Sequence, residues 1–407
     1  MLGYHIFNLI IHVLTAFLVY QLLFQILQLS NSNKNSPTTA SANGHGAQAL
    51  PLLDDNLFWP SFLGGLLFLV HSLATQAVTY ITQRYTSLAT LFYVASVFCY
   101  LKARTIVSGR QRVRSMAPEQ KLFFNPHHLA WYGLSVLAAV LAMYTKEMSI
   151  TLPVVTLLVE FLFVECSFKN IGKRALYLLP LLSTGLIIPF NHLPIFEASD
   201  TASMVETITN PDKILPRWAE EEYLSRRTYF FSQVGIIWSI YLRLLVWPWG
   251  HNIEHDFFVS DGLFHTTTLV AFLGLLSLLV TATLTIKNYR LLGFGILWLF
   301  ITISVTSSII TNTILVAEHR VYLPMTGLTF VIVGMCRHLK RPRIFWSLAI
   351  PIILILSVLT FMRNQVWKDD LTLWAHALEK SPNMSRPYVN YARALHGLQP
   401  ALSRDLP

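Results

Sequence analysis

The fold is decided by runs such as residues 4–27, YHIFNLIIHVLTAFLVYQLLFQIL, which contains no Asp, Glu, Lys or Arg. A helix that crosses a bilayer needs about 20 mostly apolar residues, so this run is long enough to span one. The whole chain has the same character, because 54% of its 407 residues are hydrophobic, only 13% are charged, and its mean hydropathy is +0.50. Soluble domains carry about 25% charged residues. The sequence therefore predicts an all-α integral membrane protein.

Further apolar runs bring the predicted membrane spans to about ten. One more stretch, 229–248, differs from them because its uncharged part ends at Arg243. A run of that length is typical of a helix that lies in the interface or re-enters the membrane. The remaining predicted spans are 58–73, 86–101, 128–145, 149–166, 174–190, 266–286, 291–310, 321–336 and 344–362.

The basic residues predict how the spans are oriented. They cluster in short stretches between apolar runs, so the net charge of +9 is a topology signal and does not indicate a nucleic-acid groove. The positive-inside rule places all four clusters in the cytoplasm, which requires that 229–248 does not cross. The clusters are Lys102, Arg104, Arg110, Arg112, Arg114 and Lys121; Lys169, Lys173 and Arg174; Lys287 and Arg290; and Arg337, Lys340, Arg341 and Arg343.

This orientation divides the chain into two predicted domains. Residues 1–362 form a polytopic membrane domain, in which 29–57 is a flexible cytoplasmic loop. Within the same domain, 191–265 is an extracytoplasmic loop that carries the interfacial helix 229–248. Residues 363–407 change to a soluble, amphipathic pattern broken at Ser-Pro-Asn (SPN), which resembles the opening hairpin of a tetratricopeptide array placed outside the membrane.

Two outer turns offer basic residues. Arg84 follows Gln83 at the start of a span, and its guanidinium matches phosphate oxygens, although an interfacial arginine can also reach lipid headgroups. Lys146 and Glu147 form a tight turn between two spans. That pair is either a structural ion pair or a lysine that neutralises a lipid phosphate while the glutamate orients it.

Two further islands carry mixed charge. The stretch 251–256, HNIEHD, holds His255 with the acids Glu254 and Asp256. Its His and carboxylate side chains are of the types that bind a divalent metal, but their spacing fits no specific metal motif, so we assign none. A metal therefore stays one alternative, beside a solvated loop and an acid that acts on an acceptor. The stretch 317–324, AEHRVYLP, places Glu318 and His319 beside Arg320. A solvated turn and an anion site are both compatible with it.

The predicted location of these polar turns on one face of the membrane is a stronger indication of a binding site than any single turn. Arg84, Lys146 and Arg320 come from three separate outer turns, and each offers one basic side chain. Such a set suits an anionic lipid headgroup held at the outer membrane surface.

Several motifs, in this order, resemble one family. They are HSLATQAVTYITQRYTSLATLFY, TKEMSITLPVVTLLVEFLF, YLRLLVWPWGHNIEHDF, AEHRVYLPMTG and NQVWKDDLTLWAHALEKSPN. The sequence is similar to the bacterial branch of multi-pass, tetratricopeptide-repeat-containing type C glycosyltransferases, which are relatives of the transmembrane-and-tetratricopeptide O-mannosyltransferases. The resemblance implies a type C glycosyltransferase-like helical bundle. It also implies transfer of a sugar from a polyprenyl-phosphate donor to a protein or peptide acceptor, bound through the repeats, outside the cell (inner) membrane.

The resemblance also assigns roles to residues. Arg84, Lys146 and Arg320 would bind the donor phosphate, because basic groups stabilise the leaving anion. The supporting positions are Glu147, His319, His255, Glu254 and Gln83. The family's base lies on a first outer loop, which would precede Met1, so the chain is expected to be truncated at both ends, with Glu318 and Asp256 as weak substitutes. No cofactor is assigned, and a divalent metal has no support in the sequence.

Two other functions compete with this enzyme. A membrane-anchored tetratricopeptide scaffold without activity is favoured by the expected loss of the base. A transporter of lipid-linked saccharides would need ionisable residues within the spans, and there only Glu160 stands out.

Overall fold

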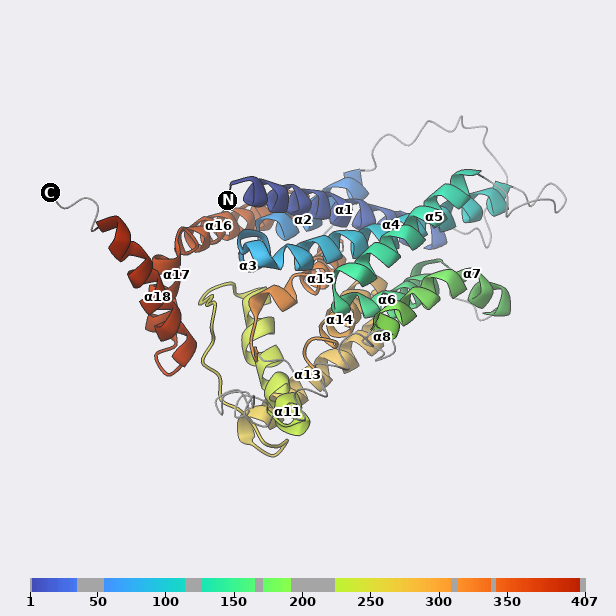
Figure 1. Cartoon of the computed structure of the whole chain (residues 1–407). Helices are drawn as coiled ribbons and strands as arrows, with labels where there is room; N and C mark the ends of the chain where they lie inside the picture. The colour runs from blue at the N-terminus through green and yellow to red at the C-terminus, as the bar shows by residue number, and fades with distance from the viewer. Residues whose placement is uncertain are drawn as a thin grey trace, which may run out of the picture.

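The computed structural model describes residues 2–34, 55–113, 126–164, 171–191, 224–308, 314–337 and 342–402. In these ranges the regular structure is entirely helical, which confirms the expected all-α membrane protein (Figure 1). Residues 35–54 of the predicted loop 29–57 and residues 192–223 of the predicted loop 191–265 lie outside the described residues. Arg114, Lys121, Lys169, Lys340 and Arg341 also lie outside them.

Several of the described helices are joined by short turns, whereas a longer segment separates the helix Arg243–Val246 from the helix Thr266–Thr285. The principal elements are α1 (Leu2–Lys34), α2 (Asp55–Val70), α3 (Ala74–Thr79), α4 (Arg84–Val113), α5 (Pro126–Thr145), α6 (Leu152–Val159), α7 (Ile171–Ser183), α8 (Ile187–Asn191), α11 (Arg226–Ile236), α12 (Arg243–Val246), α13 (Thr266–Thr285), α14 (Arg290–Ile303), α15 (Met325–Cys336), α16 (Pro342–Val366), α17 (Asp370–Lys380) and α18 (Ser385–Leu402). Two π-helical segments, Glu160–Val164 and Ile237–Leu242, continue α6 and α11. One-turn 3₁₀ helices at Ile81–Gln83, Glu147–Thr151, Thr184–Leu186 and Glu318–Val321 make the remaining joins.

Each predicted span corresponds to an apolar helix. Within the described ranges, seven helices are long and apolar enough to cross a membrane, and four shorter apolar helices accompany them. The short ones are Leu57–Val70, Arg174–Phe190, Arg290–Ile303 and Met325–Cys336. One of the seven is Arg226–Val246, the segment expected to lie in the interface. Length alone permits it to cross, so its interfacial placement stays a prediction.

The centre of the bundle is filled by aromatic rings. Trp298 on α14 is fully buried, with its ring centroid 5.5 Å from Tyr93 on α4 and 5.2 Å from Phe330 on α15. Its indole nitrogen donates a hydrogen bond to the carbonyl of Leu323, 3.2 Å away. A buried indole N–H needs such a partner. This bond therefore ties the core to the turn that precedes α15.

The backbones of α14 and α15 touch where two glycines face each other. A Cβ added to Gly295 would lie 2.6 Å from the carbonyl oxygen of Gly327 and 2.8 Å from the nitrogen of Val331. These neighbours are backbone atoms, which cannot move aside as a flexible side chain can. The close crossing of the two helices therefore requires a glycine, which has no Cβ, at this position. Small residues generally permit close approach at interfaces between membrane helices.

At one end of the bundle, Glu160 is buried within the helices. Its carboxylate accepts hydrogen bonds from Arg104 Nη2 at 2.5 Å, from Arg104 Nε at 3.0 Å and from the Tyr100 hydroxyl at 2.6 Å. The bidentate pair neutralises both charges away from water. Glu160 is thus accounted for as a link between α4 and the π-helical end of α6.

The segment Arg226–Val246 runs across the direction of α1 and α4 in the view of Figure 1. Its contacts with the 314–320 turn extend along its length. The side-chain amide of Gln233 donates to the carbonyl of Leu315 at 2.8 Å, and the hydroxyl of Tyr241 accepts from the nitrogen of Ala317 at 3.0 Å. The carbonyl of Leu245 then meets His71 at 3.0 Å.

Substituting Gly295→Ala tests the α14–α15 contact. The added methyl should lower the free energy of unfolding by about 1–3 kcal/mol, because it overpacks a backbone–backbone crossing. Gly133→Ala on α5 is the matched control, since its added Cβ meets nothing within 4 Å. Thermal unfolding of the purified variants measures both. Equal melting temperatures for the two variants would contradict the crossing.

Candidate functional site

The loop that enters the candidate site begins with a sharp turn at Gly250. Its φ is +85°, a conformation that side chains with a Cβ rarely adopt. An added Cβ would also lie 3.4 Å from Nη1 of Arg243, which donates a hydrogen bond to the carbonyl of Trp249. The turn leads the chain from α12 into the HNIEHD loop, residues 251–256, and directs it over the end of the bundle.

Glu318 is the centre of the site and is only 1% exposed. One carboxylate oxygen accepts from His251 Nδ1 at 3.0 Å, and the other accepts from His255 Nε2 at 2.9 Å and from the backbone nitrogen of Asn252 at 2.7 Å. The guanidinium of Arg363 lies 3.9 Å away. Both oxygens are therefore occupied by donors from the 251–256 loop.

These neighbours keep Glu318 ionised. Burial alone would raise its pKa, but the charge and hydrogen bond of His251, the hydrogen bond of His255 and the charge of Arg363 hold the pKa well below its usual range. Hydrogen bonds to the charged form act in this direction. The carboxylate is thus a fixed anion that organises its surroundings.

The turn around Glu318 is held by side chains from distant segments. After Ala317, which is extended, one 3₁₀ turn spans Glu318–Val321. The nitrogen of His319 donates to Gln76 Oε1 at 2.6 Å, and the carbonyl oxygens ahead of the turn accept from Arg320. Backbone groups of a buried turn require such partners, so its position is determined by the fold around it.

The structure brings Lys146 and Arg320 to one region. Lys146 Nζ donates to Thr86 Oγ1 at 2.7 Å. Burial lowers the pKa of Lys146, and the charge of Arg320 lowers it further, whereas Glu147 opposes the shift. His319 lies beside both cations: burial, then the charges of Lys146 and Arg320, lower its pKa to about 3.

Arg320 also has a structural contact. Its Nη2 donates to the carbonyl of Ile314 at 2.5 Å, and its Nη1 donates to the carbonyl of Leu315 at 3.1 Å and to the Tyr229 hydroxyl at 3.4 Å. The side chain is 5% exposed. It therefore joins the 314–320 turn to α11 while it adds positive charge near Lys146.

Arg84 has different surroundings. Its guanidinium lies 5.5 Å from the ring centroids of Tyr4 and of Tyr85, beside an open groove at the N-terminal end of α1. Thr86, which contacts Lys146, is two residues further along α4, about 200° around the helix. Within the described residues, no hydrogen bond or ion pair joins Arg84 to Lys146 or Arg320, and its phosphate role stays a prediction.

The supporting residues also divide between two places. Thr86 donates to Gln83 Oε1 at 3.0 Å, which connects Gln83 to Lys146, whereas the Glu147 side chain is exposed. Glu254 and Asp256 face away from Glu318. Glu254 pairs with Arg386 at 2.8 Å, and the exposed Asp256 accepts from Asn383 at 2.8 Å.

The 251–256 loop therefore also holds the C-terminal hairpin of α17 and α18. The buried hydroxyl of Ser381 donates to the carbonyl of Glu254 at 2.8 Å and accepts from the nitrogen of Asp256 at 3.1 Å and from Asn252 Nδ2 at 2.9 Å. In Figure 1 this hairpin stands at the same end of the bundle as the N-terminal end of α1. One loop thus contacts both Glu318 and the hairpin.

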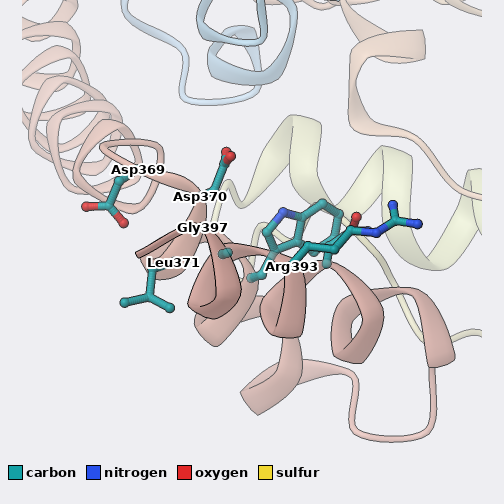
Figure 2. A pocket seen from close by; sticks show the side chains of 8 residues that line it. Asp369, Asp370, Leu371, Arg393 and Gly397 are labelled. Atoms are coloured by element: carbon teal, nitrogen blue, oxygen red, sulfur yellow. The ribbon is translucent and has the colours of Figure 1, made fainter. Parts of the chain in front are cut away.

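Between α17 and α18 the hairpin has a groove of about 550 Å³. Figure 2 shows Asp369 and Asp370 at one end of it, while the side chain of Arg393 extends toward the other end. Trp374 and Asn390 also line it. The groove offers a hydrophobic ring with charges of both signs.

Sequence reasoning missed several residues of the site. Ser72 contacts His251 Nε2 at 2.8 Å, Thr86 contacts Lys146, and Arg363 lies near Glu318. Only Arg363 had a signal, because it is a lone charge at the end of a long apolar run. Within the described ranges, groups of three or more His, Cys, Asp or Glu do not converge as a metal site would require.

Comparison with known proteins places this geometry in context. The chain is 22% identical over 405 residues to a protein O-mannosyl-transferase of Caenorhabditis elegans, an alignment that covers 97% of this chain and 48% of that protein. The chain thus spans about half the length of the curated relative it matches. The comparison supports a glycosyltransferase-like membrane protein. No family model matches the chain, and no solved structure matches it.

Buried histidines should make this end of the molecule sensitive to acid. Burial lowers the pKa of His71 to about 4, and burial with nearby cations lowers that of His319 to about 3. The unfolded chain would take up these protons near pH 6.5. Stability should therefore fall as the pH drops from about 6.5 toward 4, and Glu318, whose pKa is also lowered, adds to the loss below about 4.5.

Unfolding measured from pH 7 to pH 4 checks this. His319→Gln should reduce the slope of unfolding free energy against pH by up to about 1.4 kcal/mol per pH unit. His265→Gln, which replaces an exposed ring, is the control. A slope that His319→Gln leaves unchanged would argue against a neutral, partly buried ring.

Proposed function

We propose that the chain is the membrane part of a glycosyltransferase that moves a sugar from a polyprenyl-phosphate donor to a protein acceptor. The observation that carries this proposal is the convergence of the buried Arg320 and the partly buried Lys146, two cations from segments far apart in the sequence. Buried like charges are costly unless an anion compensates them. A donor phosphate would supply that anion, and the similarity to an O-mannosyl-transferase supports a sugar as the transferred group.

In this proposal the basic residues stabilise the leaving group. The ammonium of Lys146 has three donors, one of which is directed to Thr86. As the acceptor oxygen attacks the anomeric carbon, the bond to the phosphate oxygen breaks and charge accumulates on the phosphate. Fixed cations favour the more highly charged leaving phosphate over the singly charged phosphodiester of the donor. Arg84 would contact the headgroup from the side of α1.

Glu318 and Asp256 differ in how well they could accept the proton of the acceptor hydroxyl. Glu318 accepts three hydrogen bonds and has a lowered pKa, so it is a weak proton acceptor and we assign it a positioning role. Asp256 is exposed, and its carboxylate accepts a hydrogen bond from Asn383. It is the better candidate of the two to meet an acceptor hydroxyl.

We further propose that this end of the bundle is extracytoplasmic and that Arg226–Val246 lies along it in the interface. Tyr229, Gln233, Tyr241 and Leu245 cover the length of that segment, and each contacts a polar turn at this end. A crossing helix would carry one end away from those turns. The basic clusters at the other ends of the spans support a cytoplasmic location there.

Sugar transfer from a radiolabelled polyprenyl-phosphate sugar to a peptide tests the enzyme. Lys146→Met should reduce the rate by at least about 100-fold, as removal of one stabilising group does elsewhere, and Lys146→Arg should retain more activity. Lys368→Met, at an exposed position after α16, is the control. Photocrosslinking of a polyprenyl phosphate gives a second readout that needs no turnover. Unchanged crosslinking in Lys146→Met would overturn the assignment.

One observation favours a scaffold as the second candidate function. The 251–256 loop uses Asn252, Glu254 and Asp256 to fix the α17–α18 hairpin, so much of its polarity serves docking. The groove of Figure 2 would then accept a partner segment with an apolar residue between charges of both signs. A transporter has less support, because Glu160 is paired with Arg104.

Ser381→Ala tests the docking of the hairpin. Loss of the hydroxyl should remove a hydrogen-bond partner from the side-chain amide of Asn252 and from the carbonyl of Glu254. The contact between the 251–256 loop and the hairpin should then be destabilised by about 1–3 kcal/mol. Hydrogen exchange in α17 and α18 should then become faster, while exchange in α14 stays the same. Ser385→Ala, at an exposed position at the start of α18, is the control. Equal exchange in both variants would show that the hairpin does not depend on this contact.

A further inference from the structure

A cavity of about 300 Å³ lies where three elements meet, away from Lys146. The turn 248–251 forms one side, the end of α16 forms another, and α17 closes the third. Its lining includes Trp249, Met362, Arg363, His376 and Lys380. This is the lower end of the volume range of pockets that hold small ligands.

The polar wall of the cavity is positive. Arg363 is 5% exposed, and its Nε and Nη2 have no hydrogen-bond partner within the described part of the chain. Lys380 donates to the carbonyl of His251 at 3.0 Å, so its ammonium stands close to the same space. His376 contributes a ring nitrogen that is likewise without a partner among these residues.

The nearest carboxylate offsets the charge of Arg363 but accepts no hydrogen bond from its Nε and Nη2 groups. Glu318 lies 3.9 Å from Arg363, but its two oxygens already accept hydrogen bonds from His251, His255 and Asn252. A buried guanidinium with two unpaired groups is costly. An anion with several acceptor oxygens, seated in the cavity, would pair them.

The other wall is apolar and faces outward. Trp249 is 58% exposed and Met362 is 51% exposed, and Leu359 stands beside them. Tryptophan at such a position is typical of the level of lipid headgroups. A ligand with an anionic head and a hydrocarbon tail fits this combination better than a fully soluble ion does.

We propose that this cavity binds the phosphate group of an anionic phospholipid, held by Arg363 and Lys380, with its acyl chains along Leu359 and Met362. The bound lipid would connect α16 to α17 and thereby fasten the C-terminal hairpin to the membrane surface. This site goes beyond the proposed sugar transfer and uses neither Lys146 nor Arg320. It can therefore be tested whether or not the chain is a transferase.

The test measures lipid binding to the purified full chain in detergent, by native mass spectrometry with added phosphatidylglycerol or phosphatidylcholine. We expect one phosphatidylglycerol to bind at least about tenfold more tightly than phosphatidylcholine. Lys380→Gln should weaken its binding about fivefold, as loss of one cation near a lipid surface does. Leu359→Trp, which fills the cavity and leaves the cations in place, should remove it.

Lys368→Gln is the matched control, because it removes an exposed lysine outside the cavity. The Lys368→Gln variant should bind phosphatidylglycerol as tightly as the unchanged chain does. Thermal unfolding of each variant without lipid verifies that the fold is intact. A fall in affinity for Lys368→Gln as large as that for Lys380→Gln would overturn the proposal.

A free phosphate is the other source of the same chemistry. In a second arm, inorganic phosphate is titrated against the delipidated chain and against the chain with bound phosphatidylglycerol. Millimolar phosphate should displace little lipid, because it lacks the apolar contacts. Full displacement at that concentration, or equal binding of the two lipids, would overturn a lipid site.

Discussion

The organisation of the polar end depends on one buried carboxylate. Glu318 accepts three hydrogen bonds from the 251–256 loop and lies near Arg363 of α16. A buried carboxylate without such partners would be very costly. The 251–256 loop, the turn around Glu318 and α16 must therefore be arranged so that these contacts form. The same loop then fixes the C-terminal hairpin through Ser381. The contacts of Glu318 support the positioning role proposed for it.

The cations around this centre perform separate tasks. Lys146 and Arg320 approach each other on one side, whereas Arg363 and Lys380 face a cavity on another. Arg320 also supports the backbone ahead of Glu318. In the functions proposed above, positive charge thus serves a candidate donor site, a lipid contact and the fold itself. These tasks are distinguished by the hydrogen-bond acceptors and carboxylates that already neighbour each cation.

Particular residues show how far sequence reasoning extends. It predicted the apolar helices, because burial in lipid requires long apolar runs that can be read along the chain. It placed Arg84, Lys146 and Arg320 in one set because each follows a span on the same side. The structure joins only Lys146 and Arg320, since the side chain of Arg84 points to Tyr4 on α1. The direction in which a side chain points from its helix depends on how the helices pack. The spacing between spans in the sequence does not predict that direction.

The sequence by itself determined the class of protein, the number of apolar helices and the polar segments that could form a site. These follow from local hydrophobicity and charge, which act residue by residue. Only the tertiary structure decided that Glu318 is surrounded by His251, His255 and Arg363, and that Glu254 and Asp256 turn toward the hairpin. Those contacts join segments more than 40 residues apart. They arise from the way the helices pack, because a buried charge selects its partners in space and not along the chain.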